Sequence, residues 1–345
     1  MKYILNKLPV KTTNGFKIND VEVDLDLVKY VHSKDYQIEG DLSSLVIQKS
    51  IKKEKITSKI GLEVKDYFDL EIKIPKNVQI KKPVFISYDF KNQDVLHSNI
   101  HFIYGENSSC DFILTMKSMD EGSHFNYLIE KVVSNKNSCG NITFLNLFNQ
   151  NSNMFYALEN DVLENASITH TIIDLGGKTR LYNVYSSLLE KNAVNHLNTI
   201  YIGKNDSLLD FNYYLKNVGK ESNNQMKVEG VLGDTCHKNF RGTIDFIKGC
   251  CHSIGEENEN CVLLSDTCRS RSLPQLLCGE EDVIGAHGVS SGKVSEEKLF
   301  YLMSKGYSKK EAERLLVLGK FDTILQQIPD LQTRDVVSSL IENIL

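Results

Sequence analysis

Three short runs decide the fold class of this chain: Asn141-Ile-Thr-Phe-Leu145, Ile168-Thr-His-Thr-Ile-Ile173 and Asn198-Thr-Ile-Tyr-Ile202. Each run is rich in β-branched and aromatic residues, which favour strands, and polar residues separate one run from the next. Four of the five prolines lie at positions 9, 75, 83 and 274, so residues 84–273 contain no proline. Proline is the residue least compatible with interior strands. The sequence therefore predicts a large β domain built from many short strands.

The spacing of the turn signals suggests how these strands are arranged. Signals recur about every 11 to 16 residues, which suggests stacked β units, although no clean repeat motif is visible. A sandwich or a barrel gives similar punctuation, so the residues alone leave three architectures open: a β-solenoid, a sandwich and a barrel. The signals lie near Asn149, Asn165, Gly176, Lys191, Lys204, Lys220, Gly233 and Gly249.

The two ends of the chain differ from this central region. The first 75 residues are mixed, and we expect short helices at residues 24–31 and 42–52. After Gly292 the apolar period changes from 2 to 3.6, which predicts helices. We therefore expect a mixed N-terminal segment (1–75), a β core (76–291) and a C-terminal helical domain (292–345).

Capping signals set the expected helix ends in this C-terminal domain. Ser295 can cap a first helix that ends at Gly306. Ser308 and Glu311 have capping-box spacing for a second helix, which we expect to end at Gly319. A third helix is expected to start at Thr333, with one apolar stripe. The stripe consists of Val336, Val337, Leu340, Ile341 and Ile344.

The composition excludes several classes of protein. The chain has 345 residues, 41% of them hydrophobic and 25% charged, as expected for a soluble protein with a core. A net charge of -5 argues against a nucleic-acid partner, which requires a basic face. No apolar run approaches the roughly 18 residues that span a bilayer, and the N-terminus lacks a signal-peptide core. We expect a cytoplasmic protein, no membrane association and reduced cysteines.

Potential metal ligands are concentrated late in the chain. No C-x-x-C pair occurs among them, so structural zinc is poorly supported. We expect Cys110, Cys139 and Cys236 to be buried strand residues, because free cysteine packs well in cores. The late ligands are Cys250, Cys251, His252, Cys261, Cys268, Cys278 and His287, of which Cys250, Cys251 and Cys261 are expected in the core or in turns.

Cys268 and His287 stand apart from the others. Cys268 follows an apolar run, and Arg269 and Arg271 could favour its thiolate, so a ligating thiol and an inert one are equally supported. His287, alone in a glycine-rich turn, would be structural more often than functional.

Neither the acidic residues nor the known catalytic motifs indicate an enzyme. We expect Glu256-Glu257 and Glu280-Glu281-Asp282 to be solvated turns rather than acid/base pairs. No phosphate-binding loop, nucleophile elbow or dinucleotide fingerprint occurs. A carbohydrate-active enzyme on a β-helix remains an alternative, with Asp234, Arg241 and Asp245 as candidates. A purely structural adaptor is another.

Four motifs occur in one order: Asn260-Cys-Val-Leu-Leu-Ser-Asp-Thr-Cys268, Leu273-Pro-Gln-Leu-Leu277, Ile284-Gly-Ala-His-Gly288 and Leu299-Phe-Tyr-Leu302. This combination resembles the C-terminal signature of the SufB/SufD family. The resemblance covers about residues 74 to 325 and is strongest after Arg241-Gly242. It implies a right-handed parallel β-helix and a non-catalytic scaffold for iron–sulfur cluster assembly.

The resemblance also implies ligands for a transient iron–sulfur cluster. Cys268 matches the place where SufB carries a cysteine implicated as a cluster ligand, and His287 aligns with the histidine implicated in SufD. Gly288 stands where SufB has a glutamate, and no cysteine between Gly140 and Thr235 matches the sulfur-accepting cysteine of SufB. Both departures favour a SufD-like subunit. Cys268 instead suggests a homodimeric hybrid, in which it faces His287 of a second copy.

The partners implied by the family are the ABC-type ATPase SufC, a SufB-type subunit or a second copy of this chain, and a sulfur-donor protein. ATP hydrolysis is expected in SufC, whose closure would shift the interface between the β cores and expose the cluster site. The helical tail would dock SufC through Leu299, Phe300, Tyr301, Leu302, Ala312, Leu315 and Leu316.

Overall fold

The fold is a parallel β-solenoid built from two nine-stranded sheets, as the family resemblance implies, and neither a sandwich nor a barrel. The structure is a computed structural model that describes residues 2–12, 15, 17–24, 36–52, 56–57, 59–61, 63–64 and 67–345. From β7 to β22 the chain alternates between the two sheets, so each of these strands pairs with the one two positions away in the sequence. Within the long central run every pairing is parallel.

The first sheet contains, in spatial order, β22 (Val283–Gly292), β20 (Ser253–Leu263), β18 (Asn223–Leu232), β16 (Val194–Gly203), β14 (Ser167–Asp174), β12 (Cys139–Leu147), β10 (Phe112–Ser118), β8 (Val84–Phe90) and β3 (Gln37–Glu39). The second contains β21 (Arg269–Cys278), β19 (His237–Phe246), β17 (Leu208–Asn217), β15 (Thr179–Leu188), β13 (Asn153–Val162), β11 (Phe125–Ser134), β9 (Val95–Tyr104), β7 (Tyr67–Ile74) and β4 (Val46–Lys52). Two small pairs, β1 (Lys2–Leu5) with β2 (Val21–Asp24) and β5 (Ile56–Thr57) with β6 (Glu63–Val64), complete the strands among the described residues.

A column of stacked asparagines marks one row of turns. Five asparagines have left-handed φ angles between 53° and 62°, a conformation that asparagine tolerates better than most residues. The side-chain amide of each asparagine after the first donates to the amide oxygen of the one before it, at 2.9 to 3.2 Å. Glu221 and His252 continue the column with φ angles of 56° and 61°. The asparagines are Asn77, Asn107, Asn137, Asn165 and Asn192.

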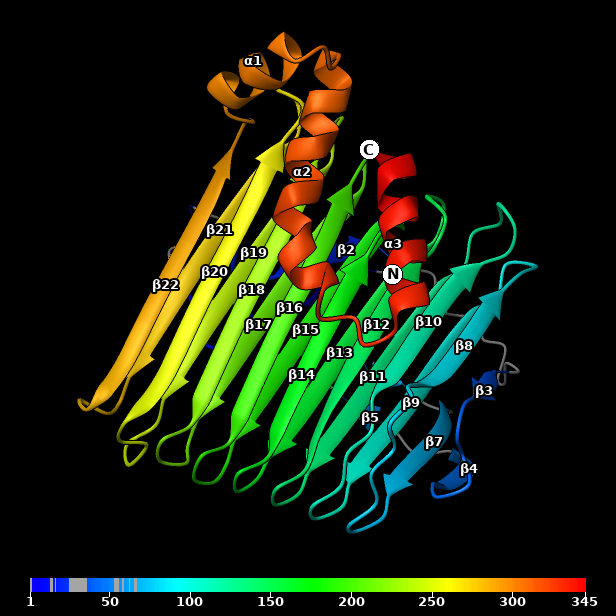
Figure 1. Cartoon of the computed structure of the whole chain (residues 1–345), viewed down its shortest axis with the longest axis vertical. Coiled ribbons are helices and arrows are strands. Elements are labelled where there is room, and N and C mark those ends of the chain that lie inside the picture. Colours follow the sequence, from blue (N-terminus) through cyan, green and yellow to red (C-terminus); the bar gives the residue numbers. More distant parts are fainter. Residues whose placement is uncertain are drawn as a thin grey trace.

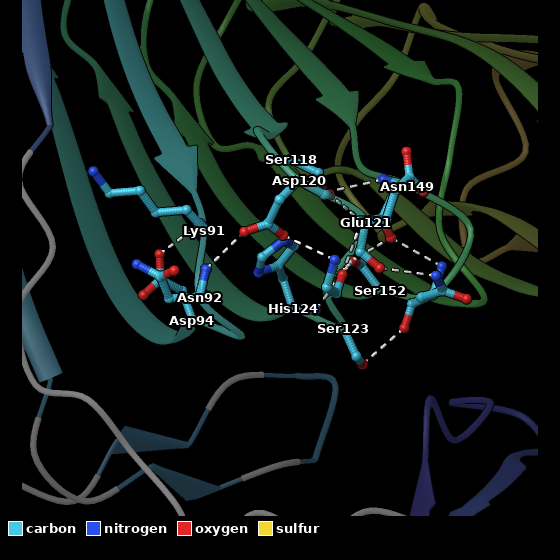
Figure 2. Close-up of polar contacts among 12 residues, drawn as sticks. Lys91, Asn92, Asp94, Ser118, Asp120, Glu121, Ser123, His124, Asn149 and Ser152 are labelled. Carbon is cyan, nitrogen blue, oxygen red and sulfur yellow. Dashed lines mark hydrogen bonds and ion pairs between the residues drawn. The ribbon is translucent and has the colours of Figure 1, made fainter.

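The opposite row of turns is held by bonds from side chains to the backbone of neighbouring coils. Figure 2 shows Asp120, whose Oδ2 accepts the backbone N–H of Asn92 at 2.8 Å. Its Oδ1 lies 3.0 Å from Nε2 of the buried His124. Asn149 Nδ2 donates to the carbonyls of Asp120 and Gly122 at 2.7 and 2.8 Å. These bonds join neighbouring coils along this row of turns, as the asparagine column does along the other.

The space between the sheets is a packed apolar core with many aromatic rings. Phe144 and Tyr156, for example, stack with ring centroids 4.6 Å apart. The outer face of the first sheet is covered by helices α2 (Lys309–Leu325) and α3 (Leu331–Ile344) (Figure 1). Helix α1 (Glu296–Ser304) lies beyond the ends of β20 and β22. No helix among the described residues has the length and apolar character needed to cross a membrane.

The N-terminal hairpin, formed by β1 and β2, packs on the outer face of the second sheet. Both terminal nitrogens of the fully buried Arg241 bind the carboxylate of Asp210, at 2.7 and 2.8 Å. The Arg241 Nε donates to the carbonyl of Ile18. Asn6 Nδ2 also donates to Asp210 Oδ1, at 2.8 Å. Arg241 therefore has a structural role.

Several expected element ends are wrong. Residues 46–52 form strand β4 rather than a helix, because they pair with β7. Asp24 ends β2, and the rest of the helix expected at 24–31 lies outside the described residues. Helix α2 runs through Gly319 to Leu325, since its last turns bury Phe321 and Ile324. Helix α3 is capped by Asp330 and begins at Leu331, and the stripe residue Val336 is exposed.

The two ends of the solenoid differ. At the N-terminal end, β3 and β4 pair antiparallel with β8 and β7 and interrupt the parallel stacking. At the C-terminal end, β21 and β22 have neighbours on one side only among the described strands, namely β19 and β20 (Figure 1). We call these the capped end and the open end.

Candidate functional site

Strand β22 leaves a long uncharged edge at the open end. Its sequence, Val-Ile-Gly-Ala-His-Gly-Val-Ser-Ser-Gly, contains no charged residue, and eight of its ten residues are exposed. An exposed, uncharged edge strand is a template for pairing with another chain, and proteins usually block such edges with charge, short length or a cover. Strand β21 beside it carries Pro274, which is tolerated because the strand lies at an edge. The open end therefore has the features of an interface.

Cys268 lies directly before β21, at the rim of this end. Its side chain is only 7% exposed and belongs to the apolar core. The thiol is placed to donate to the carbonyls of Ser265 and Leu232, at 3.1 and 3.7 Å. Arg269 and Arg271 are exposed, and strand alternation directs them away from the core side. Cys268 is therefore sheltered below the rim, and the two arginines project to the opposite face of the strand.

His287 lies in the middle of β22 and is exposed. Gly285, two residues earlier, faces Leu276 and Phe246 of the interior. Because side chains alternate along a strand, His287 projects from the same inner face. It is therefore presented at the open mouth of the solenoid.

Cys268 and His287 do not meet within one chain. The hydroxyls of Ser270 and Ser291 are 3.0 Å apart, which sets the offset between the facing strands β21 and β22. With this offset His287 faces the region of Pro274, six residues beyond Cys268. At about 3.3 Å per residue, the two side chains lie roughly 20 Å apart along the strand direction. A shared ligand would require a second polypeptide.

Two buried carboxylates lie one coil below this rim. Glu259 is fully buried and receives hydrogen bonds from Lys238 Nζ at 2.7 Å, Tyr201 Oη at 2.9 Å and Ser272 Oγ at 2.8 Å. Glu257 is also fully buried, but neither of its carboxylate oxygens has a hydrogen-bond partner among the described residues. Burial, and secondly the charge of Glu259, raise the pKa of Glu257 to about 8.

The expectation that Glu256-Glu257 forms a solvated turn is therefore wrong. Glu257 lies inside β20 and is in register with Met226, whose partner in the coil below is Leu197. An alignment of successive coils on the residues of the asparagine column would have placed Glu257 in the same interior row as Met226 and Leu197. The expected solvated turn at residues 280–282 is confirmed, since Glu280 accepts backbone N–H groups of that exposed turn.

The other cysteines form no evident metal centre. No group of three or more potential ligands among the described residues is arranged to hold a metal ion. Cys110 and Cys236 are buried as expected, and burial raises the pKa of each thiol to about 12. Cys139 is exposed, which contradicts the expectation of a buried side chain. Cys250 and Cys261 are buried, and Cys251 is half-buried in a turn, in line with the prediction.

The three candidates for a carbohydrate enzyme do not assemble into a catalytic groove. Arg241 is buried under the N-terminal hairpin with both terminal nitrogens on Asp210. Asp234 lies in a turn and accepts the N–H of Asn205. Asp245 accepts the hydroxyl of Tyr214 on the outer face of β19.

Helix α1 has no buried residue. Phe300 is 76% exposed and Tyr301 is 59% exposed, whereas Leu299 and Leu302 are half-buried. A groove of about 550 Å³ runs between this helix, the start of α2 and the end of β20, and Leu264 and Met303 are among its lining residues. An apolar helix face without a covering element marks an interaction site.

The α2 residues expected to bind a partner are less uniform. Leu315 is exposed, Leu316 is half-buried and Ala312 is fully buried. Ala312 therefore supports the helix from inside, and the accessible apolar surface is concentrated on α1.

Comparison with known proteins identifies the core. Residues 87–320 match the family model described as SUF system FeS cluster assembly, SufBD core domain. The chain is 26% identical over 278 residues to the iron–sulfur cluster assembly protein SufD of Bacillus subtilis (strain 168), covering 78% of this chain and 62% of the relative. It is 20% identical over 224 residues to SufD of Escherichia coli (strain K12), covering 64% and 52%.

A third relative is a SufBD family protein of Pyrococcus horikoshii, described as an iron–sulfur cluster assembly protein. It is 30% identical over 166 residues, which cover 48% of this chain and 36% of the relative. The chain thus spans less than two thirds of the length of each of these three relatives.

Proposed function

This chain belongs to the SufBD family of the SUF iron–sulfur cluster assembly system, and from that premise we propose that it is a SufD-like scaffold subunit. In this role it performs no catalysis itself. Its open end pairs with a SufB-type chain, and its helical tail docks a SufC-type ABC ATPase. A transient iron–sulfur cluster is assembled where the two scaffold chains meet.

The observation that carries the proposal is the uncovered edge at the open end. Strand β22 has ten residues without a charge, eight of them exposed, and His287 projects from its inner face. A second scaffold chain would satisfy the unpaired backbone groups and bring its own ligands to His287. Imidazole and thiolate both ligate iron in clusters of this kind.

The bare face of α1 supports the ATPase contact. Phe300 and Tyr301 supply exposed aromatic surface of the type enriched in interface hot spots. Closure of the ATPase would pull on the helical tail, which packs through α2 on the outer face of the first sheet. Such a pull would shift the two scaffold chains relative to each other.

Cys268 supports a second candidate, a homodimeric scaffold in which each copy supplies both ligands. In that arrangement Cys268 of one copy approaches His287 of the other. The roughly 20 Å between these side chains within one chain is compatible with ligation only across two chains. The sheltered thiol would become accessible when the open end rearranges on pairing.

Anaerobic purification of the tagged chain from native cytoplasm tests these roles. We expect an ABC ATPase and a SufB-type chain with the unaltered protein. Phe300→Ser should lose the ATPase, whereas Val336→Ser, at an exposed apolar residue of α3, should retain it. Absence of any ATPase from the unaltered complex would overturn the proposal. Recovery of the ATPase with this chain as the sole scaffold would establish the homodimeric form.

His287→Ala tests the cluster site separately. We expect the variant to retain its partners and fold, since the residue is exposed, but to lose most iron and acid-labile sulfide from the complex. His237→Ala, at an exposed histidine of β19, is the matched control and should retain both. Equal cluster content in the His287 variant and the control would refute a role for this residue.

A further inference from the structure

Glu257 is a buried carboxyl group without a hydrogen-bond partner among the described residues. Its side chain crosses from β20 toward β19, where a Cβ added to Gly242 would lie 2.0 Å from its Oε1. Only a glycine at position 242 therefore leaves room for this carboxylate. A buried carboxylate without a hydrogen bond or counter-ion is strongly destabilising, so such groups take up a proton or a cation.

The neighbouring Glu259 shows what a purely structural carboxylate looks like in this interior. It projects into the same space, two residues further along β20, and its oxygens are occupied by an ammonium and two hydroxyls. Nothing comparable approaches Glu257 among the described residues. This difference in hydrogen-bond partners indicates that Glu257 is free to bind a ligand from outside the chain.

His287 is the nearest candidate to share that ligand. It is the direct register partner of Glu257 on the adjacent strand. Side chains of register partners project from the same face, with Cβ atoms about 5 Å apart. Glu257 is sealed beneath the last coil, whereas His287 is exposed at its rim. The pair therefore forms a short path from solvent to the buried carboxyl group.

We propose that Glu257 and His287 form a binding site for a divalent cation, ferrous iron in particular, at the mouth of the solenoid. The carboxylate would supply an anionic oxygen and the imidazole a nitrogen, a donor set that suits Fe²⁺. The exposed side of the cation would remain open to water or to a group of a docking chain. The site uses no thiol, so it is distinct from any ligation by Cys268.

This inference rests on the proposed function, because it assigns the site to iron as a substrate of cluster assembly. It extends that function by placing a metal ion on this chain before the scaffold chains share a cluster. Sulfide and a partner ligand would then reach iron already positioned by Glu257 and His287.

Anaerobic equilibrium dialysis of the purified full chain with Fe²⁺ tests the site directly. We expect one ion per chain in the unaltered protein and a loss of affinity of about tenfold or more in Glu257→Gln and in His287→Ala. Glu256→Gln, on the outward face of the same strand, is the matched control and should bind as the unaltered chain does. Unchanged affinity in Glu257→Gln would overturn the proposal, since a carboxylate satisfied by a proton alone makes no contribution to iron binding.

Co²⁺ offers a second readout that separates this site from cysteine. Its spectrum should show oxygen and nitrogen ligation without thiolate charge transfer, and Cys268→Ser should leave the spectrum unchanged. A thiolate band that disappears in Cys268→Ser would refute the assignment. Circular dichroism of each variant verifies the fold. Failure of iron binding leaves the partner complex intact, whereas failure of the proposed function removes the partners, so the two failures are distinguishable.

Discussion

The edge strands at the two ends of the solenoid differ in how well they are protected against pairing with another chain. At the capped end, β8 meets β3, which has only three residues, and β7 meets β4, which carries the exposed Lys49. Short length and lysine are common means of preventing edge pairing. At the open end, β22 extends ten residues without a charge. The difference indicates that the capped end is protected against pairing with another chain, whereas the open end is not.

The buried carboxyl groups also differ between the middle of the solenoid and its open end. In the middle of the solenoid, Glu130 lies fully buried with coils on both sides and receives one hydrogen bond, from Tyr156 Oη at 2.8 Å. Below the open end, Glu257 has no hydrogen-bond partner among the described residues but lies one coil from the surface. A central carboxylate can be satisfied only by the protein itself, whereas one at the open end can be satisfied by an incoming ligand.

The largest expected effect contrasts one isoleucine at each end. Ile86 in β8 is fully buried beneath β3, whereas Ile284 in β22 is 64% exposed. Ile86→Ala should lower the free energy of unfolding by about 2–5 kcal/mol. Ile284→Ala should change it by no more than about 0.5 kcal/mol. Urea unfolding of the isolated chain measures both, and equal losses would show that the open end is packed in the isolated chain.

The next prediction uses the central carboxylate. Burial raises the pKa of Glu130 from 4.5 to about 7, so its stabilising contribution is fully present below pH 4.5 and is lost as the pH rises through about 7. Glu130→Gln avoids this loss and should be more stable than the unaltered chain above pH 7, by on the order of 3 kcal/mol. Melting temperatures at pH 4.5 and 8.5 measure the effect, and a gain that is equal at both pH values would contradict it.

A smaller effect is expected in the asparagine column. Asn165 combines a φ angle of 54° with ladder bonds to Asn137 and Asn192. Asn165→Ala removes these bonds and places alanine in a left-handed conformation, at a cost of about 1–2 kcal/mol. Asn165→Gly keeps the conformation accessible and should cost less. Thermal unfolding compares the two, and a greater loss with glycine would argue against left-handed strain.

The smallest effect concerns the same column near the open end. Glu221 has a φ angle of 56° and one exposed ion pair, with Lys191 Nζ at 3.0 Å. Because exposed pairs contribute little, Glu221→Asn should extend the column and stabilise the chain by about 0.5 kcal/mol. A loss of stability in thermal unfolding would show that the column ends before this coil for a structural reason.

Much of the fold could be predicted from local residue patterns. The strand runs around Thr143, Thr171 and Ile200 all lie inside strands of the solenoid, and the turn signals alternate between its two rows of turns. The repeat was missed because it spans two strands and two turns. Its marker is the left-handed residue of one row, which recurs every 27 to 31 residues and changes identity at Glu221 and His252.

The candidate site was less predictable. His287 could be singled out only through family resemblance, since a lone exposed histidine has no diagnostic pattern. Polar and basic residues flank Cys268 in the sequence, yet its thiol is buried while Arg269 remains outside. The burial of Glu257 is not visible in the sequence, because Gly255, Glu257 and Glu259 replace the apolar residues that normally reveal an inward face. Sequence patterns detect burial through hydrophobicity, so they miss polar residues in a core.

The central claim is that the open end is the docking surface for a second scaffold chain. Hydrogen–deuterium exchange of the isolated chain and of the purified complex tests it most directly. We predict that residues 269–292 gain amide protection in the complex, while residues 37–49 at the capped end exchange equally in both. Protection gained at the capped end, with residues 269–292 unchanged, would contradict the account.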